Sequence, residues 1–278
     1  MEASTAPLRI ALAQVNTTVG DIDGNAALVA DWIGRAKAAG AGVVVFPEQT
    51  IGGYPAEDLW LKEHFLAAGR RALDELAAGV QGIVALIGFA EHDGAIHNSL
   101  AVVGDGAVQA VYRKMLLPNY GVFDERRYFE PGTTPALIEA GGALVGLTIC
   151  EDVWFGGPPA SVEAEGGARL VVNASASPYH LRKGAFREAL LAERAAETGA
   201  SFALCNLVGG QDELVFDGHS LVVSGEGEVL ARGAQFEEEL VICDLDLPRS
   251  GGSAGGVPVV ATFEVAPPEG PGPGAPPR

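Results

Sequence analysis

The sequence predicts an α/β sandwich in which helices pack on mixed β-sheets. Short apolar runs of strand length alternate with segments that carry apolar residues at helical spacing. Later in the chain, this alternation gives way to strands joined by glycine turns. That order of elements is typical of the sandwich architecture. The chain has 278 residues, of which 48% are hydrophobic, so we expect one large core in a single domain.

The individual elements follow from the hydrophobic period and the turn residues. Residues 43–46 are wholly apolar and mostly β-branched, which indicates a strand that is covered on both faces. Strands are expected at residues 8–15, 43–46, 83–89, 99–103, 107–112, 143–149, 170–172, 202–205, 220–223, 228–231 and 240–244. Helices are expected from Asn25 to Gly40, across 57–76 and across 183–198, where Phe186, Leu190 and Leu191 should face inward.

Two segments are predicted to be loops, and one to be a tail. Residues 113–132 are polar and aromatic without a clear period, and a loop of that length is usually functional. Residues 209–212 form the second predicted loop. The domain is expected to cover residues 1–248, followed by a flexible tail over 249–278 that buries little apolar area. Residues 250–256 have the composition of a linker, and residues 267–278 contain six prolines and three glycines.

Composition excludes several classes of function. The formal net charge is −18 and no basic patch stands out, so we expect no nucleic-acid partner. No apolar run reaches the roughly 18 residues of a membrane span, and no signal peptide is recognised at the N-terminus. Three scattered cysteines do not make a disulfide framework, and no CxxC or HExxH spacing supports a metal site. We therefore expect a cytoplasmic protein with reduced thiols.

The segment from Leu147 to Trp154 is the first candidate for chemistry. A predicted buried strand ends in Cys150, which is followed by Glu151, Asp152 and a tryptophan. Reactive groups lie at strand ends in open α/β folds, and free backbone N–H groups there can favour a thiolate. The alternative is a cysteine that only packs in the core, where free cysteine is common.

Two further polar residues also follow predicted strands. Glu48 comes after residues 43–46 and Lys114 after residues 107–112, so both could lie beside Cys150. A buried carboxylate can take the proton of a thiol and return it to a leaving amine. A buried ammonium can stabilise an oxyanion and keep the carboxylate charged. No histidine stands at a comparable strand end, so a Cys–His pair is the weaker hypothesis. Glu48 near a helix cap and Lys114 in solvent are the ordinary alternatives.

The strings around these residues resemble the nitrilase, or carbon–nitrogen hydrolase, superfamily. They are residues 46–48 (FPE), 113–114 (RK) and 149–152 (ICED). Longer strings at 53–59 (GYPAEDL), 117–125 (LPNYGVFDE) and 209–218 (GGQDELVFDG) resemble the glutaminase domain of the glutamine-dependent NAD synthetases. The resemblance covers about residues 8–247. It implies a single-domain α-β-β-α sandwich with a Glu–Lys–Cys triad.

The resemblance also implies a role for each site residue. Glu48 would be the general base, Lys114 the support of the oxyanion, Cys150 the nucleophile and Glu125 a second glutamate that braces the lysine. The glutamine pocket would be formed by the following seven residues: Tyr54, Tyr120, Phe123, Glu151, Trp154, Ser177 and Lys183. Whether Lys183 or the preceding Arg182 faces the substrate stays open, and core packing is the alternative for each aromatic residue.

The implied reaction is hydrolysis of the glutamine side-chain amide through a cysteine thioester, without a cofactor. The ammonia would serve an NAD synthetase that amidates nicotinic acid adenine dinucleotide. Residues 250–255 (SGGSAG) only superficially resemble the SGGxDS phosphate loop of such a synthetase, so the synthetase is expected as a separate subunit or a missing domain. A homo-oligomer is also expected. The alternatives are a free-standing ω-amidase acting on another small amide and a catalytically idle binding subunit, which the complete triad disfavours.

Overall fold

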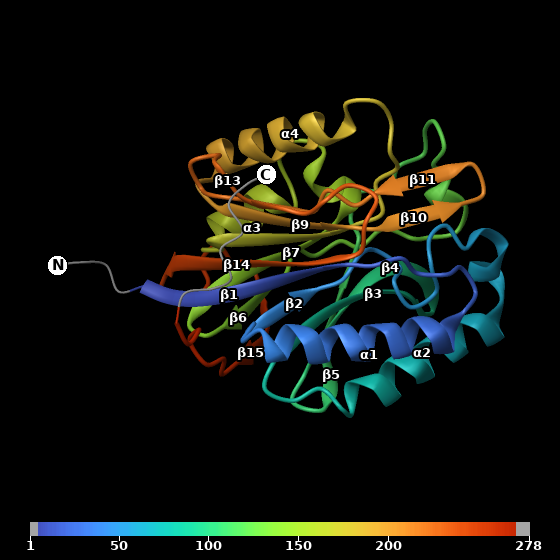
Figure 1. The fold of residues 1–278 in the computed structure, drawn as a ribbon, viewed down its shortest axis with the longest axis horizontal. Helices are drawn as coiled ribbons and strands as arrows, with labels where there is room; N and C mark the ends of the chain where they lie inside the picture. Colours follow the sequence, from blue (N-terminus) through green and yellow to red (C-terminus); the bar gives the residue numbers. More distant parts are fainter. Residues whose placement is uncertain (1–4, 271–278) are drawn as a thin grey trace.

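Residues 5–270 are described by the computed structural model, and they form four layers in the order α-β-β-α. Figure 1 shows α4 and α3 on one side of the paired sheets and α1 and α2 on the other. The predicted α-β-β-α sandwich is therefore confirmed.

The first sheet contains six strands. In spatial order these are β14 (Glu239–Pro248), β1 (Thr5–Gln14), β2 (Val43–Val45), β3 (Val84–Asp93), β4 (Ala95–Gly104) and β5 (Ala107–Arg113). β1, β2 and β3 are parallel. β5 runs in the same direction as β3, because the steps from β3 to β4 and from β4 to β5 are both antiparallel. The carboxyl ends of β2 and β5 therefore lie at the same edge of the sheet.

The second sheet contains seven strands. In spatial order these are β13 (Val229–Arg232), β12 (Leu221–Val223), β9 (Ser201–Asn206), β8 (Leu170–Ser175), β7 (Ala143–Ile149), β6 (Leu137–Ala140) and β15 (Val259–Phe263). β7, β8 and β9 are parallel and lie in its centre. A separate antiparallel pair is formed by β10 (Val208–Gln211) and β11 (Leu214–Asp217).

Four α-helices cover the outer faces of the sheets. They are α1 (Ile22–Ala38) and α2 (Glu63–Ala77) on the first sheet, and α3 (Ala160–Glu165) and α4 (Lys183–Thr198) on the second. Three 3-10 turns are η1 (Glu57–Leu61), η2 (Glu125–Arg127) and η3 (Cys150–Val153). α1 begins three residues earlier than predicted, because the side chain of Asp21 caps it by accepting the Gly24 N–H at 3.1 Å. Within residues 5–270, no helix is long and apolar enough to cross a membrane.

Three apolar clusters fill the three interfaces between the layers. Residues 10–13 of β1 show why a central strand can be apolar at successive positions. Ile10 and Leu12 belong to the cluster between the two sheets, whereas Ala11 and Ala13 belong to the cluster under α1 and α2. Successive side chains point to opposite faces of a strand, so a strand that is covered on both faces needs apolar residues at every position.

Several sequence expectations are corrected by the structure. The predicted helix over 57–76 is split into η1 and α2, and residues 209–212 belong mainly to the β10–β11 hairpin. β6 and α3 were not expected, because both are short and neither has a clear period. Phe186 on α4 was expected to face inward, but it is 53% exposed and stacks on Trp154 at a centroid distance of 5.6 Å.

The predicted tail over residues 249–278 is wrong for part of its length. β15 pairs in parallel with β6, with Val259 opposite Leu137 and Phe263 opposite Ala140. Phe263 is buried in the cluster between the sheets, and its ring lies where a side chain on Gly104 would have to be, 2.5 Å from an ideal Cβ. The Pro/Gly composition around β15 hid a five-residue apolar strand. Residues 271–278, part of the predicted disordered segment, lie outside the described residues.

The strand β15 should contribute measurably to stability. Phe263→Ala removes a buried ring and leaves a cavity beside Gly104, so we expect a loss of about 3 kcal/mol in the free energy of unfolding. Phe236→Ala is the matched control, because Phe236 is 53% exposed and its loss should cost less than about 1 kcal/mol. Urea unfolding curves measure both variants. Equal losses in the two would contradict a packed β15.

Candidate active site

The three predicted triad residues are brought together by strand ends on the two facing sheets. Glu48 lies in the turn after β2, and Lys114 directly follows β5 at the same edge of the first sheet. Cys150 directly follows β7 in the centre of the second sheet. All three side chains are buried. The carboxyl ends of parallel strands thus form the site, as expected for α/β folds.

Lys114 links two carboxylates. Its Nζ lies 2.7 Å from Oε1 of Glu48 and 2.8 Å from each carboxylate oxygen of Glu125. The Tyr54 hydroxyl also donates to Oε1 of Glu125, at 3.1 Å. Burial lowers the pKa of the Lys114 ammonium, but the charges of Glu125 and Glu48 outweigh burial and raise its pKa well above the usual value. Burial raises the pKa of Glu125 to about 7, against the opposing effect of Lys114. The lysine is therefore a permanent cation between two carboxylates.

Cys150 has an unusual backbone conformation and a protonated thiol at rest. Its φ is +41°, in the left-handed region that residues other than glycine rarely adopt. Such strain is often found at functional sites. Burial, followed by the charge of Glu48, raises the pKa of the Cys150 thiol well above its usual range, while Lys114 opposes that shift. A base must therefore remove the thiol proton before or during any attack by sulfur.

Asp152 connects the turn that begins at Cys150 with the loop that follows Lys114. Its Oδ1 accepts the backbone N–H groups of Met115 at 3.1 Å and Leu116 at 2.8 Å. Its Oδ2 accepts the Tyr112 hydroxyl at 2.8 Å and the Ile149 N–H at 2.9 Å. Burial raises the pKa of Asp152 to about 6, although these donors act in the opposite direction. Sequence reasoning noted Asp152 only as a neighbour of Cys150, because three of its four donors lie on or just after β5 of the other sheet.

Glu48 has two further partners that the sequence did not reveal. Asn98 on β4 donates from Nδ2 to Oε1 at 2.7 Å, and the backbone N–H of Ala176 donates to Oε2 at 3.0 Å. Asn98 stands between His97 and Ser99, just before an apolar run. Three consecutive polar residues where the predicted strand begins were the sequence signal that could have identified Asn98. Within residues 5–270, no group of three or more His, Cys, Asp or Glu side chains could hold a metal ion.

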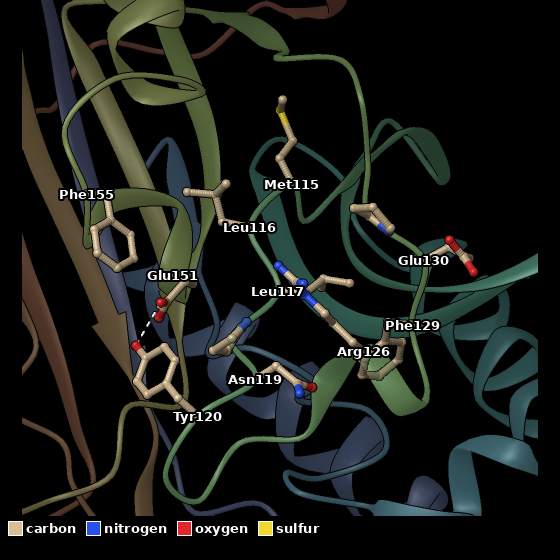
Figure 2. A pocket seen from close by; sticks show the side chains of 12 residues that line it. Met115, Leu116, Leu117, Asn119, Tyr120, Arg126, Phe129, Glu130, Glu151 and Phe155 are labelled. Atoms are coloured by element: carbon tan, nitrogen blue, oxygen red, sulfur yellow. Dashed lines mark hydrogen bonds between the residues drawn. The ribbon is translucent and has the colours of Figure 1, made fainter.

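A pocket of about 600 Å³ lies beside this buried cluster. Figure 2 shows Glu151 and Tyr120 at one end of it, joined by the hydrogen bond from the Tyr120 hydroxyl at 2.7 Å, and Phe155 above them. Burial is the main cause that raises the pKa of the Glu151 carboxyl, which is 4% exposed. The remaining lining comes mostly from the loop after Lys114: Met115, Leu116, Leu117, Pro118, Asn119, Arg126, Phe129, Glu130 and Pro131.

The other predicted pocket residues fall into two groups. Tyr54 is buried against Trp60 and Phe216 and its hydroxyl is used by Glu125, so it supports the triad from behind. Phe123 is half-buried and packs edge-on against Tyr120, with ring centroids 5.8 Å apart. Both contact residues of the candidate site, Glu125 and Tyr120, but neither is in the lining of the 600 Å³ pocket.

Lys183, rather than Arg182, points toward the buried cluster. Its Nζ lies 3.8 Å from the ring centroid of Trp154. Burial lowers the pKa of Lys183, as does the nearby Arg187, while Cys150 and Glu151 raise it. The effects of Cys150 and Glu151 indicate that the Lys183 ammonium lies near these two residues, whereas Arg182 is an exposed residue at the start of α4 with φ of +69°.

Ser177 is held beside α4 by a buried ion pair. Nη2 of Arg187 donates to the Ser177 carbonyl at 2.9 Å and to Oδ1 of Asp217 at 2.7 Å. The Ser177 N–H donates to Oδ1 of Asn206 at 2.8 Å. Arg187 lies one turn after Lys183, so the same helix places Lys183 near the cluster and fixes the backbone of Ser177. Neither Arg187 nor Asp217 was expected from the sequence.

Sequence comparison relates the chain to one family of hydrolases. The family model described as carbon-nitrogen hydrolase matches residues 9–253. The chain is 46% identical to a glutamine-dependent NAD(+) synthetase of Thermotoga maritima and 48% identical to one of Xylella fastidiosa. These matches cover 86% and 85% of this chain, but only 42% and 44% of the relatives. The chain thus spans less than half the length of these relatives.

Structural comparison gives two kinds of neighbour. A glutamine-dependent NAD+ synthetase of Acinetobacter baumannii superposes with a TM-score of 0.81 at 35% identity, over 86% of this chain and 46% of that chain. An amidase of Nesterenkonia sp. superposes with a TM-score of 0.78 at 28% identity, over 88% of this chain and 93% of that chain. That amidase carries the acetamide moiety of fluoroacetamide on its active-site cysteine.

The buried lysine should stabilise the fold as well as the site. Lys114→Met leaves Glu48 and Glu125 buried without their cation, so we expect a loss of about 3 kcal/mol or more in the free energy of unfolding. Without the ammonium, these carboxyls bind protons more tightly in the folded chain than in the unfolded chain. The deficit relative to the wild type should therefore shrink as the pH is lowered.

Lys37→Met is the matched control, because the Lys37 ammonium is exposed and bonds only to the Gln81 carbonyl. Its cost should be within about 0.5 kcal/mol and should not depend on pH. Chemical denaturation at several pH values measures both variants. A Lys114→Met deficit that is small, or that grows at low pH, would show that the two glutamates do not depend on the lysine.

Proposed function

Because the chain belongs to the carbon-nitrogen hydrolase family, we propose that it hydrolyses the side-chain amide of glutamine through a thioester on Cys150. The observation that carries this proposal is the buried chain Glu48–Lys114–Glu125 beside the strained Cys150. The similarity to glutamine-dependent NAD(+) synthetases supports glutamine as the substrate.

The first half of the reaction forms the thioester. Glu48 takes the proton from the Cys150 thiol as the sulfur attacks the amide carbon. The charge that develops on the amide oxygen is stabilised by the Lys114 ammonium, which costs no reorganisation because Glu48 and Glu125 already hold it in place. Glu48 then gives the proton to the leaving nitrogen, the carbon–nitrogen bond breaks and ammonia departs.

The second half releases glutamate. Glu48, again a carboxylate, takes a proton from water as the water oxygen attacks the thioester carbon. The carbon–sulfur bond breaks, and the proton returns to sulfur to restore the thiol. The high pKa of the Cys150 thiol favours this return. Lys114 stabilises the second oxyanion as it did the first.

The polar groups around the cluster suit the α-amino acid end of glutamine. The buried Glu151, with Tyr120, offers a carboxylate for the ammonium group. Lys183 offers a cation for the carboxylate group, and its ammonium lies over the Trp154 ring. Ser177, Trp154 and Phe123 complete the proposed pocket. We assign the direct contacts to Glu151 and Lys183, and a supporting role to Tyr54.

The ammonia is proposed to serve a synthetase that amidates nicotinic acid adenine dinucleotide. The relatives named as NAD(+) synthetases are more than twice as long as the matched region, so a second domain or a separate subunit would supply the remaining activity. Exposed apolar side chains beside the site, such as Val122 and Leu181, give such a partner a contact surface. We propose the cytoplasm as the location, and the expected homo-oligomer stays a prediction.

A free-standing amidase is the second candidate. The Nesterenkonia amidase is covered over 93% of its length by this chain, so no additional domain is needed for that activity. The same triad would serve both reactions. The two candidates differ in substrate preference and in their response to a synthetase.

Loss of the nucleophile or the base should abolish hydrolysis selectively. Cys150→Ser should remove measurable glutamate release, and Glu48→Gln should lower kcat by about 10²-fold or more, because a general base is lost. Cys205→Ala and Cys243→Ala are the controls, since both cysteines are buried away from the Glu48–Lys114 pair. A glutamine-like electrophile followed by peptide mass mapping should label Cys150. Labelling of Cys205, or near-normal kcat in Glu48→Gln between pH 6 and 9, would overturn the assignment.

The proposed partner should stimulate the reaction. The loop after Lys114 carries Glu125 and much of the pocket, so a partner that favours its competent conformation raises kcat. We expect slow glutamate release by the isolated chain, and faster release with an ammonia-using NAD synthetase, ATP and nicotinic acid adenine dinucleotide. Leu181→Ser, which changes a 78% exposed side chain beside the site, should weaken this stimulation.

Leu230→Ser on β13 is the matched surface control and should leave the stimulation unchanged. Glutamate release and size-exclusion chromatography provide the two measurements. An isolated chain that is already fast, ignores the synthetase and prefers another ω-amide would favour the free-standing amidase.

A further inference from the structure

Asn98 contacts two members of the triad at once. It is fully buried on β4, the strand next to β5. Its side-chain Nδ2 donates to Oε1 of Glu48 at 2.7 Å, and its backbone carbonyl accepts the N–H of Lys114 at 2.8 Å. One residue therefore fixes both the carboxylate of Glu48 and the start of the loop that carries Lys114.

The orientation of the Asn98 amide is determined by Gln49. Nε2 of Gln49 donates to the Phe89 carbonyl at 3.0 Å and to Oδ1 of Asn98 at 2.9 Å. The Phe89 carbonyl can only accept, so Gln49 must present its NH₂ group there. Asn98 must then turn its oxygen to Gln49 and its NH₂ group to Glu48. A flipped Asn98 would place its oxygen against the carboxylate.

The turn that contains Glu48 and Gln49 has little room to move. Gln49 has a φ of +53°, and the turn presses directly on Gly88 of β3. An ideal Cβ on Gly88 would lie 2.4 Å from the Gln49 nitrogen and 2.4 Å from the Pro47 carbonyl oxygen. Only glycine allows this approach, which holds Gln49 and, through it, Asn98 in register with Glu48.

The donors around Glu48 leave its two oxygens with different capacity. Oε1 accepts both Lys114 Nζ and Asn98 Nδ2, whereas among residues 5–270 Oε2 accepts only the Ala176 N–H. A carboxylate oxygen has about two lone-pair positions, so Oε1 is filled and Oε2 keeps one free. We propose that Asn98 is a positioning residue that fills Oε1 of Glu48 and so directs the proton of Cys150 to Oε2.

A neutral donor suits this position, because the surroundings of Glu48 are already crowded with ionisable groups. The groups that face it are Lys114, Cys150, Glu125, Glu151 and Tyr54. Asn98 supplies a hydrogen-bond donor to the Glu48 carboxylate. It does so without adding a charge to the cluster. The inference rests on the proposed role of Glu48 as the base.

Two variants of Asn98 and one control test the inference. Asn98→Ala removes the donor, and Asn98→Asp keeps the shape but places a second carboxyl against Glu48. Gln14→Ala is the control, because Gln14 is a buried amide with three hydrogen bonds to Ser220, Ala234 and Glu237 and none to the triad. The primary readout is the pH dependence of Cys150 alkylation by iodoacetamide, which needs no glutamine. Glutamate release gives kcat and KM as a second readout.

In Asn98→Ala, the acidic midpoint of the alkylation profile should move up by about one pH unit, because one donor to the Glu48 carboxylate is lost. Asn98→Asp should move it further, since two adjacent carboxyls share a proton. For glutamate release, kcat should fall about tenfold while KM changes less than about twofold. Gln14→Ala should lower stability but leave the midpoint in place.

An unchanged midpoint in Asn98→Asp, or an equal shift in Gln14→Ala, would overturn the proposal. Asn98→Asp keeps the test decisive if Asn98→Ala does not fold. If the Asn98 variants shift the alkylation midpoint but even the wild type releases no glutamate, the result would count against glutamine as the substrate, while the role of Asn98 stands.

Discussion

One ammonium between two carboxylates organises this molecule. Lys114 is buried with Glu48 and Glu125, at distances of 2.7 and 2.8 Å. Removing such charges from water is costly unless each is paired, and the pairs form only when the whole fold has formed. Glu48 comes from a turn after β2, Lys114 follows β5 and Glu125 lies in the loop beyond it. The ion-pair chain is therefore assembled by the topology of the first sheet and the conformation of one loop.

The second sheet supplies Cys150, and the hydrogen bonds of Asp152 set the distance between Cys150 and the first sheet. Asp152 accepts four donors, two of them from the backbone just after Lys114 and one from the residue before Cys150. The apolar cluster between the sheets stabilises their contact but does not fix their relative position, because the hydrophobic effect is non-directional. The hydrogen bonds of Asp152 fix that position, because hydrogen bonds have narrow distance and angle requirements. The result is a thiol, a base and a cation held together before a substrate arrives.

Local patterns in the sequence predicted much of the fold and the main reactive residues. Wholly apolar runs such as residues 43–46 identified the central strands, and the polar residues after them identified Glu48, Lys114 and Cys150 as candidates. What could not be read was pairing across the sheets. Asn98 donates to Glu48, which lies 50 positions away, and Asp152 accepts the N–H of Leu116, which lies 36 positions away, so neither contact could be read from local sequence. β15 was missed because the Gly and Pro residues around it outweighed its four apolar residues.

The parallel pairing of β15 with β6 also has a consequence for attachments to the chain. If the segment after Pro248 were a free coil, anything fused to it would sample a wide volume, and its effective concentration near the site would be low. β15 instead fixes the chain at the edge of the second sheet as far as Phe263. The tether for a fused module thus starts after Phe263, some fifteen residues beyond Pro248, at a fixed point on the domain. Its reach is shorter by the extended length of those residues, about 50 Å.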